Sequence, residues 1–498
     1  MHYKCSLVFA GIWHHRTHRA KQGRKPGPLF QDPYGRKEFT MYQIDFNKPQ
    51  NVHFIGIGGI SMSGLAEILL GRGFHITGSD SQDSALLTRL RNKGAEIFIG
   101  QSADNIKNDC EAVVYTAAIH PDNPEFVAAK EAGIPMLSRA DLLGEIMQNY
   151  RVSIAVAGTH GKTTTTSMAS HVLLAADMDP TISVGGILQS IHGNIRVGES
   201  GTFLTEACEY TNSFLSLYPM IGIILNVDAD HLDFFKDLDD IANSFHRFAA
   251  QIPADGTLII DRDTKKFDTV TDGIDCEIIT TSLTADADYT ASDVTFDGNG
   301  CASFTCNERG KRLGSFLLSV PGVHNVSNAL AAIAMARKLG IAPEVIAEGL
   351  HSFTGTDRRF EYKGKMKGVT VVDDYAHHPT EITATINAAL QYPHRELWVI
   401  FQPHTYTRTK ALLPEFAEAL SAADHVVLAP IYAAREKDIY GVSSDDVAGE
   451  IAKLGTDVRS FGTFKEIEEY VRAQCSDGDL LITMGAGNVT NIGPELID

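Results

Sequence analysis

Short apolar runs recur along the chain and end in glycine, acidic or histidine residues. Clear examples are NVHFIGIGG (51–59), SIAVAGTHG (153–161) and LLITMGAGN (480–488). Runs of this length that stop at polar turns are typical of buried strands. The stretch after the second run has apolar residues at helical spacing, at Met168, Val172 and Leu173. The pattern predicts an α/β protein in which strands alternate with helices.

The chain of 498 residues is too long for one hydrophobic core, and domains of about 100–200 residues suggest three of them. We expect these domains at 41–150, 151–354 and 355–498. Residues 1–40 differ in composition, with eight Lys or Arg against two acidic residues and no periodic pattern. We expect a disordered leader or an upstream extension there, with Met41 as the native start, which N-terminal mass spectrometry would test.

Charge and cysteine content narrow the class of partner. The formal charge of −19 argues against a nucleic-acid or membrane-surface role, because polyanion binders usually have a basic face. Seven scattered cysteines without paired spacing fit a reducing compartment. No apolar run approaches the ~20 residues needed to cross a bilayer. These features predict a cytoplasmic protein with no nucleic-acid or membrane partner, and they leave room for a basic pocket that binds a small anion.

The stretch IAVAGTHGKTTTTS (154–167) has the layout of a phosphate-binding loop between a strand and a helix. Gly158 and Gly161 allow close backbone approach, Lys162 supplies a cation, and the Thr163 hydroxyl can bind Mg²⁺. The spacing is shorter than in the commonest loop of this kind, because Val156 stands where its first glycine would be. The alternative is an ordinary glycine turn that happens to contain a lysine.

Polar residues follow two further strands of the central region. GTFLTEACE ends in Glu206 and Glu209, and IGIILNVDADHLD ends in a cluster that includes Asp228, Asp230, His231 and Asp233. The carboxyl ends of parallel strands share one sheet edge with the phosphate loop. Thr163, Glu206 and His231 are therefore expected to converge on a magnesium–nucleotide site. Taken singly, the acid could be a helix cap or a solvated charge and the histidine could be structural.

Two more features point to nucleotides. Asn325 and Asn328 stand three residues apart at the start of an Ala-rich helix, where one could be a cap and the pair could contact an adenine edge. Near the N-terminus, Gly56, Gly58 and Asp80 occupy the positions of a dinucleotide-binding turn, but Ser61 replaces its third glycine. An NAD site and a nucleotide bound in another pose both remain open from this turn.

The last region has the same pattern of strands followed by polar turns. Its strand ends and the preceding segment contain candidate site residues: Arg358, Arg359, Asp374, Tyr375, His377, His378, His404, Tyr406, Arg408, Arg435, Glu436, Gly485, Gly487 and Asn488. An arginine at the presumed hinge could move onto a phosphate as domains close. For any one of these residues, a solvated charge is the alternative.

Together these motifs resemble the Mur ligases, which form amide bonds with ATP during peptidoglycan synthesis. The resemblance is in GTHGKTT, TEA with the downstream NVDADH, HNVSN, GIGGISMSGLA, TAAIHPDNPE, DDYAHHP and HTYTRT, and it covers residue 41 to the end. It implies an N-terminal Rossmann-like domain that binds a UDP-sugar, a central P-loop ATPase-type α/β domain, and a C-terminal Rossmann-like domain on the amino-acid side.

The resemblance also implies a reaction. ATP would activate the lactyl carboxylate of UDP-N-acetylmuramate as an acyl phosphate, and the amine of L-alanine would displace phosphate. Lys162 and Arg359 would offset charge on the transferring group, Arg408 would bind the amino-acid carboxylate, and His377, or else His378, would receive the ammonium proton.

The implied binding residues fall into three sets. Those for ATP are Gly158, Thr159, His160, Gly161, Lys162, Thr163, Thr164, Asn325, Asn328, Arg359 and Asp374. The UDP-sugar would contact Gly56, Gly58, Ser61 and Asp80, and Mg²⁺ would be held by Thr163, Glu206 and His231, with His231 also counted as catalytic.

Two departures from the family pattern affect this assignment. Thr405 stands where an arginine is expected, so a cationic contact near the amino acid is missing or relocated. The stretch SFHRFAAQ (244–251) lacks the lysine that several relatives modify into a metal ligand, so His231 would have a larger share in binding a second ion. We expect a monomer or weak homodimer. A nucleotide-binding switch and an NAD-dependent oxidoreductase are the competing hypotheses.

Overall fold

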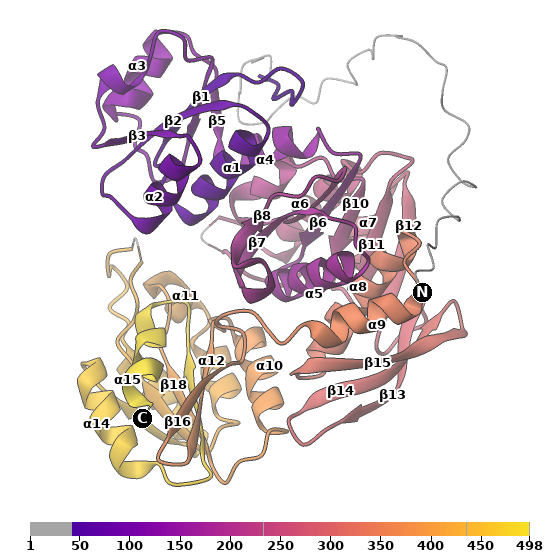
Figure 1. The fold of residues 1–498 in the computed structure, drawn as a ribbon. Coiled ribbons are helices and arrows are strands. Elements are labelled where there is room, and N and C mark those ends of the chain that lie inside the picture. Colours follow the sequence, from indigo (N-terminus) through magenta and orange to yellow (C-terminus); the bar gives the residue numbers. More distant parts are fainter. Residues whose placement is uncertain (1–41, 233, 435, 498) are drawn as a thin grey trace, which may run out of the picture. The chain divides into compact units, whose positions relative to one another are not determined.

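Three sheets follow one another along the chain in a computed structural model that describes residues 42–232, 234–434 and 436–497 (Figure 1). From Gln43 onward the chain packs as one compact unit. The predicted leader at 1–40 lies outside the described residues, as do Asp233 and Arg435.

The first sheet is parallel and, within the described residues, has five strands in the order β3-β2-β1-β4-β5. Its strands are β1 (Asn51–Ile55), β2 (His75–Asp80), β3 (Glu96–Ile99), β4 (Ala112–Tyr115) and β5 (Met136–Ser138). The helices of this region are α1 (Ile60–Gly71), α2 (Ala85–Asn92), α3 (Pro124–Glu131) and α4 (Arg139–Met147). This alternation of strand and helix in a parallel sheet is the Rossmann-like arrangement expected for the N-terminal domain.

The central sheet is larger and, across the described residues, has the order β15-β14-β13-β12-β11-β10-β6-β9-β7-β8. Its strands are β6 (Val152–Ala157), β7 (Thr181–Leu188), β8 (Gly193–Arg196), β9 (Thr202–Glu206), β10 (Ile221–Ile224), β11 (Thr257–Asp261), β12 (Glu277–Ser282), β13 (Tyr289–Phe296), β14 (Cys301–Glu308) and β15 (Lys311–Pro321). β6 lies between β9 and β10, and the three run parallel. The loops that follow them therefore meet at one edge, as the sequence predicts.

An antiparallel extension of β13, β14 and β15 continues the central sheet. The helices of this region are α5 (Lys162–Ala175), α6 (Leu238–Ala250), α7 (Phe267–Thr271), α8 (His324–Lys338) and α9 (Pro343–Ser352). α5, which starts in the phosphate loop, packs against both α8 and α9. Val172, Leu330 and Ile346 from these helices are fully buried in one core with the sheet. The phosphate loop is thus held by a helix that is fixed on two sides.

The third sheet has the order β16-β17-β21-β18-β19-β20 within the described residues, and only β16 runs antiparallel to its neighbour. Its strands are β16 (Glu361–Met366), β17 (Val369–Asp374), β18 (Leu397–Phe401), β19 (His425–Leu428), β20 (Asp457–Ser460) and β21 (Leu480–Met484). Its helices are α10 (Pro379–Ala389), α11 (Tyr406–Ala411), α12 (Leu413–Leu420), α13 (Ser444–Lys453), α14 (Phe464–Gln474) and α15 (Ile492–Leu496).

The α/β fold class with three domains is therefore confirmed, and the residues at which one domain gives way to the next stay a prediction. Among the helices of the described part of the chain, none is both long and apolar enough to cross a membrane.

Two helix glycines make a matched test of this packing. A Cβ on Gly349 in α9 would lie 2.5 Å from Val172 Cα in α5, whereas a Cβ on Gly449 in α13 would have no neighbour within 4 Å. We expect Gly349→Ala to lower the free energy of unfolding by about 1–3 kcal/mol, because overpacking against backbone outweighs the gain in helix propensity. Gly449→Ala should raise it by about 0.5–1 kcal/mol.

Urea unfolding followed by circular dichroism measures both changes. A stable Gly349→Ala variant would contradict the close α5–α9 contact.

Candidate active site

The phosphate loop connects β6 to α5 with two glycines in conformations that side chains disfavour. Gly158 has φ +145° and Gly161 has φ +84°, and a Cβ on Gly161 would lie 2.6 Å from Asn328 Oδ1. Only glycine combines this backbone with that close approach. Because the loop runs directly into the first turn of α5, its backbone amides form the kind of site that binds phosphate.

Lys162 is held by carbonyls of its own loop and by a buried acid. Its Nζ donates to Gly158 O at 2.6 Å, to Thr159 O at 3.0 Å and to Glu209 Oε2 at 2.8 Å. Burial opposes the charge of Lys162, but Glu209 outweighs this effect and raises the lysine pKa. Burial likewise works against the Glu209 carboxylate, and the attraction of Lys162 lowers its pKa despite that. The pair is therefore ionised, with its cation beside the loop.

Thr163 and Glu206 are adjacent at the same edge. Thr163 Oγ1 lies 3.2 Å from Glu206 Oε2, and the other carboxylate oxygen accepts from Gly185 N at 2.5 Å. Neighbouring ligand oxygens around an octahedral Mg²⁺ are about 3 Å apart. The hydroxyl and carboxylate therefore fit two positions around this ion, and nucleotide and water oxygens suit the rest.

His231 lies on the other side of Glu209. Its Nε2 is 3.6 Å from Glu209 Oε1, and the centroid of its ring lies 4.6 Å from that of Tyr210, with the two rings tilted by 35°. The structure thus pairs Thr163 with Glu206 directly but links His231 to the loop through Glu209 and Lys162. Among the described residues, no group of three His, Cys, Asp or Glu side chains is arranged to hold a metal on its own.

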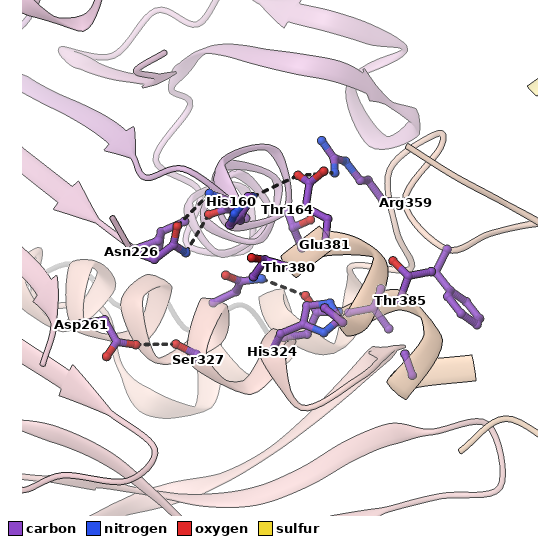
Figure 2. Close-up of a pocket in the computed structure, with 18 of the residues that line it drawn as sticks. His160, Thr164, Asn226, Asp261, His324, Ser327, Arg359, Thr380, Glu381 and Thr385 are labelled. Atoms are coloured by element: carbon purple, nitrogen blue, oxygen red, sulfur yellow. Dashed lines mark hydrogen bonds and ion pairs between the residues drawn. The ribbon is translucent and has the colours of Figure 1, made fainter. Parts of the chain in front are cut away.

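A cavity of about 340 Å³ lies beside the phosphate loop, and Figure 2 shows Arg359 and His160 among the residues that line it. The predicted ATP residues Asn325, Asn328 and Asp374 also line it. Asn328 Nδ2 donates to Asn325 Oδ1 at 3.0 Å, and Asn325 Nδ2 donates to Pro321 O at 2.7 Å. The N-cap of α8 is Val323, with no side-chain cap. The alternative that one asparagine caps this helix is therefore wrong.

The two neighbouring arginines have different surroundings. Arg358 donates to the carbonyl oxygens of Gly485 and Gly487, so it braces the third sheet. Arg359 lines the cavity. Asp374 accepts from Phe360 N and Ala376 N, each at 2.8 Å. Burial raises the pKa of Asp374 to about 6, although Arg359 opposes the rise.

A second cavity of about 470 Å³ lies where polar loops of the central and third sheets meet, and His377, His404 and Thr405 line it. Arg408 also lines it and donates to Asp230 Oδ1 at 2.9 Å. Burial opposes the charge of Asp230, but the attraction of Arg408 lowers its pKa far below the usual range. Sequence reasoning listed Asp230 without a role, because its partner is 178 residues away.

The two candidate proton acceptors, His377 and His378, differ in whether a ring nitrogen keeps a free lone pair. His378 Nε2 lies 3.1 Å from Ala229 O and must donate to it, while Nδ1 accepts from Thr380 N at 3.3 Å. Both of its nitrogens are thereby used. His377 Nδ1 lies 2.9 Å from Tyr375 O and donates to it, which leaves the lone pair on Nε2. Burial lowers the pKa of His377, so the ring is a neutral base.

The glycine turn of the first sheet is at the carboxyl end of β1. Gly56 has φ +82°, and Gly58 N donates to Asp80 Oδ2 at 2.9 Å. Ser61 is exposed in the first turn of α1. The four predicted UDP-sugar residues are thus close together, with the Asp80 carboxylate closing the turn. None of them is among the residues that line the two cavities.

His160 joins the phosphate loop to the third sheet. Its Nε2 is 3.5 Å from Asp228 Oδ2 and its Nδ1 is 3.4 Å from Glu381 Oε1 in α10. Burial would lower the pKa of His160, but Asp228 and Glu381 outweigh it and raise the pKa to about 9. Sequence reasoning listed His160 among the ATP-binding residues of the loop and gave Glu381 no role.

The chain belongs to the Mur ligase family. Models described as the catalytic domain of the Mur ligase family, the Mur ligase middle domain and the Mur ligase glutamate ligase domain match residues 51–151, 156–336 and 358–487. The first and third segments contain the first and third sheets, and the middle segment contains the central sheet except for residues 152–155 of β6.

Particular members are similar over nearly the whole chain. A UDP-N-acetylmuramate–L-alanine ligase from Agathobacter rectalis is 58% identical over 457 residues, which are 92% of this chain and 100% of the relative. The enzyme of that name from Lachnospira eligens is 58% identical over 458 residues, with the same shares. The crystal structure of UDP-N-acetylmuramate–alanine ligase from Thermotoga maritima has a TM-score of 0.73 and 29% identity, over 90% of this chain and 98% of that one.

Replacement of His160 tests the link between the loop and the third sheet. The pKa of His160 is about 9 in the folded protein against an ordinary 6.5, so its ion pairs stabilise the fold fully below pH 6.5 and the effect is lost as the pH rises through 9. We expect His160→Gln to cost on the order of 1–3 kcal/mol near pH 6 and much less near pH 10.

Urea unfolding at several pH values measures this difference, and replacement of the exposed His75 is the control for loss of a histidine. An equal cost at all pH values would mean that His160 acts by packing alone.

Proposed function

We propose that the protein is an ATP-dependent ligase that joins L-alanine to the lactyl carboxylate of UDP-N-acetylmuramate through an acyl phosphate, in the synthesis of peptidoglycan precursors. The full-length similarity to ligases of that name supports the substrates. One geometric observation supports the chemistry most strongly. The segment after β10 borders both cavities, with Asp228 lining the first and Asp230 and His231 lining the second. A nucleotide and an amine can therefore be bound on either side of one short loop.

The first step brings two anions together. A lactyl carboxylate oxygen attacks the γ-phosphorus of ATP and ADP leaves. Lys162 is beside the phosphate loop and Arg359 lines the nucleotide cavity, so both can offset charge on the transferring group. Asn325 and Asn328 present amide groups to the base from the start of α8.

Mg²⁺ fits the pair Thr163 and Glu206, whose oxygens are 3.2 Å apart. Bound there, the ion would supply positive charge that offsets the charge on the phosphates. His231 is the residue on this edge that could contribute to a second ion, and its contact with Glu209 holds it near the loop.

The second step uses the other cavity. Arg408 has a planar guanidinium that suits the carboxylate of L-alanine, which would compete with Asp230 for it. His377 Nε2 would accept a proton from the ammonium group. The freed amine attacks the acyl carbon, and phosphate leaves from the tetrahedral intermediate. Because Thr405 stands in place of an arginine, Arg408 would contribute more of the positive charge that binds the carboxylate of L-alanine.

The UDP group is proposed to bind at the turn of Gly56, Gly58, Ser61 and Asp80. Asp80 already accepts a backbone hydrogen bond there, so a nucleotide must share or displace that contact. We also propose a cytoplasmic location and a monomer or weak homodimer, with ATP, UDP-N-acetylmuramate and L-alanine as partners.

The ligase makes a strict prediction about turnover. ADP and phosphate should be released only when UDP-N-acetylmuramate and L-alanine are both present, and removal of Mg²⁺ should abolish the release. Lys162→Ala should lower kcat by about 10²-fold or more, because a charge needed in the transition state is lost. A coupled ADP-release assay measures all three effects.

Lys236→Ala is the matched control, since this lysine is 86% exposed and should leave the rate unchanged. Turnover without the two acceptor substrates would favour a nucleotide switch, and tight NADH binding would favour an oxidoreductase.

A further inference from the structure

Glu381 is a largely buried carboxylate that contacts three of the groups described above. It is the third residue of α10, and its side chain is 14% exposed. Oε1 lies 3.4 Å from His160 Nδ1 and 4.0 Å from Arg359 NH1. Oε2 accepts from His377 N at 3.1 Å and lies 3.3 Å from His377 Nδ1. One acid thus connects the phosphate loop, the cavity arginine and the candidate base.

The groups around Glu381 fix the orientation and the charge of its carboxylate. Figure 2 shows its carboxylate between the side chains of His160 and Arg359, which come from the central sheet and from the segment before β16. Burial opposes ionisation of Glu381, but the attraction of His377 and His160 keeps its pKa well below the usual range. The group is therefore a charged acceptor at neutral pH and not a proton donor.

The effect of this charge falls mainly on His377. Its Nδ1–H has two acceptors on one side, Tyr375 O and Glu381 Oε2, so the lone pair remains on Nε2. A carboxylate that holds the proton-bearing nitrogen of a histidine fixes its tautomer and makes the other nitrogen more basic.

Three further groups face the His377 ring. Arg408 from α11 lowers the pKa of His377, and Asp230 from the loop after β10 raises it. The third group is His404 after β18, whose ring centroid lies 5.7 Å from that of His377. Burial has the largest effect on the pKa of His377 and lowers it. Glu381 has the next largest effect and raises the pKa more than Asp230 does.

We propose that Glu381 is a positioning residue for the amide-forming step: it orients His377 as the acceptor of the amine proton and is itself held in place by His160 and Arg359 from the nucleotide side. The inference rests on the proposed function. In the step concerned, the proton of the ammonium group moves to His377 Nε2. The nitrogen electron pair then forms the C–N bond, and the C–O bond to phosphate breaks.

The test separates activation of the carboxylate from attack by the amine. Hydroxylamine is largely unprotonated at neutral pH and traps acyl phosphates as hydroxamates without needing a base. We expect Glu381→Gln to lower kcat/KM for L-alanine by about 10²-fold, as for loss of general-base catalysis, while hydroxamate formation from UDP-N-acetylmuramate, ATP and hydroxylamine changes little. Retained hydroxamate formation also shows that the variant is folded.

The pH profile supplies a readout that a purely structural role would not move. Removal of the negative charge beside His377 makes its protonation less favourable, so the acidic limb of the L-alanine reaction should shift to lower pH in Glu381→Gln. Glu381→Asp keeps the charge and should keep the limb near its wild-type position, with a smaller loss of rate.

Glu415→Gln is the control, because Glu415 is also the third residue of a helix with an early proline, α12, but is exposed. It should leave both reactions unchanged. Equal losses with hydroxylamine and L-alanine, or no loss with either, would overturn the assignment of Glu381. A wild-type protein that makes neither product would instead refute the proposed function.

Discussion

The site depends on keeping several charges out of water at the meeting point of two sheets. Each buried cation there has a carboxylate partner: Lys162 has Glu209, Arg408 has Asp230, and His160 has Glu381. An isolated buried charge costs several kcal/mol, and removal of one partner leaves the other uncompensated. Two of these three pairs connect the central sheet with the third sheet. The pairing of charges therefore determines both the geometry of the site and the placement of the third sheet's loops.

This constraint also suits a reaction between anions. The proposed substrates bring phosphates and two carboxylates to cations that already have internal acidic partners. Phosphate can take a share of Lys162, and the carboxylate of an amino acid can take a share of Arg408, without creating an unpaired charge at any stage. The acids released in this way are Glu209 and Asp230, and both are held near His231, whose Nε2 lies 3.6 Å from Glu209 Oε1 and 3.8 Å from Asp230 Oδ2. Substrate binding and the orientation of His231 are thereby coupled.

The sequence predicted the parts of this design that are local. Gly158 to Thr164, the strand ends at Glu206 and His231 and the paired asparagines are read from short motifs, because strand–loop–helix units place their polar residues at one edge. It did not assign roles to Glu209, Asp230 or Glu381, since each gains its meaning from a partner in another segment. The antiparallel strands β13–β15 were also missed. One face of them packs in the central core, with Phe304 and Phe316 buried, but their alternating apolar and polar residues include no motif with an obvious chemical role. Arg358 and Arg359 are neighbours in sequence, and only the structure shows that Arg358 braces the third sheet while Arg359 lines the cavity.

The central claim is that ATP activates a carboxylate by phosphorylating it. The most direct measurement uses UDP-N-acetylmuramate with ¹⁸O in both oxygens of the lactyl carboxylate, together with ATP and L-alanine, and follows the label by mass spectrometry. An acyl phosphate intermediate predicts that one ¹⁸O appears in the inorganic phosphate and the other remains in the amide product. Unlabelled phosphate together with a labelled product would contradict the account.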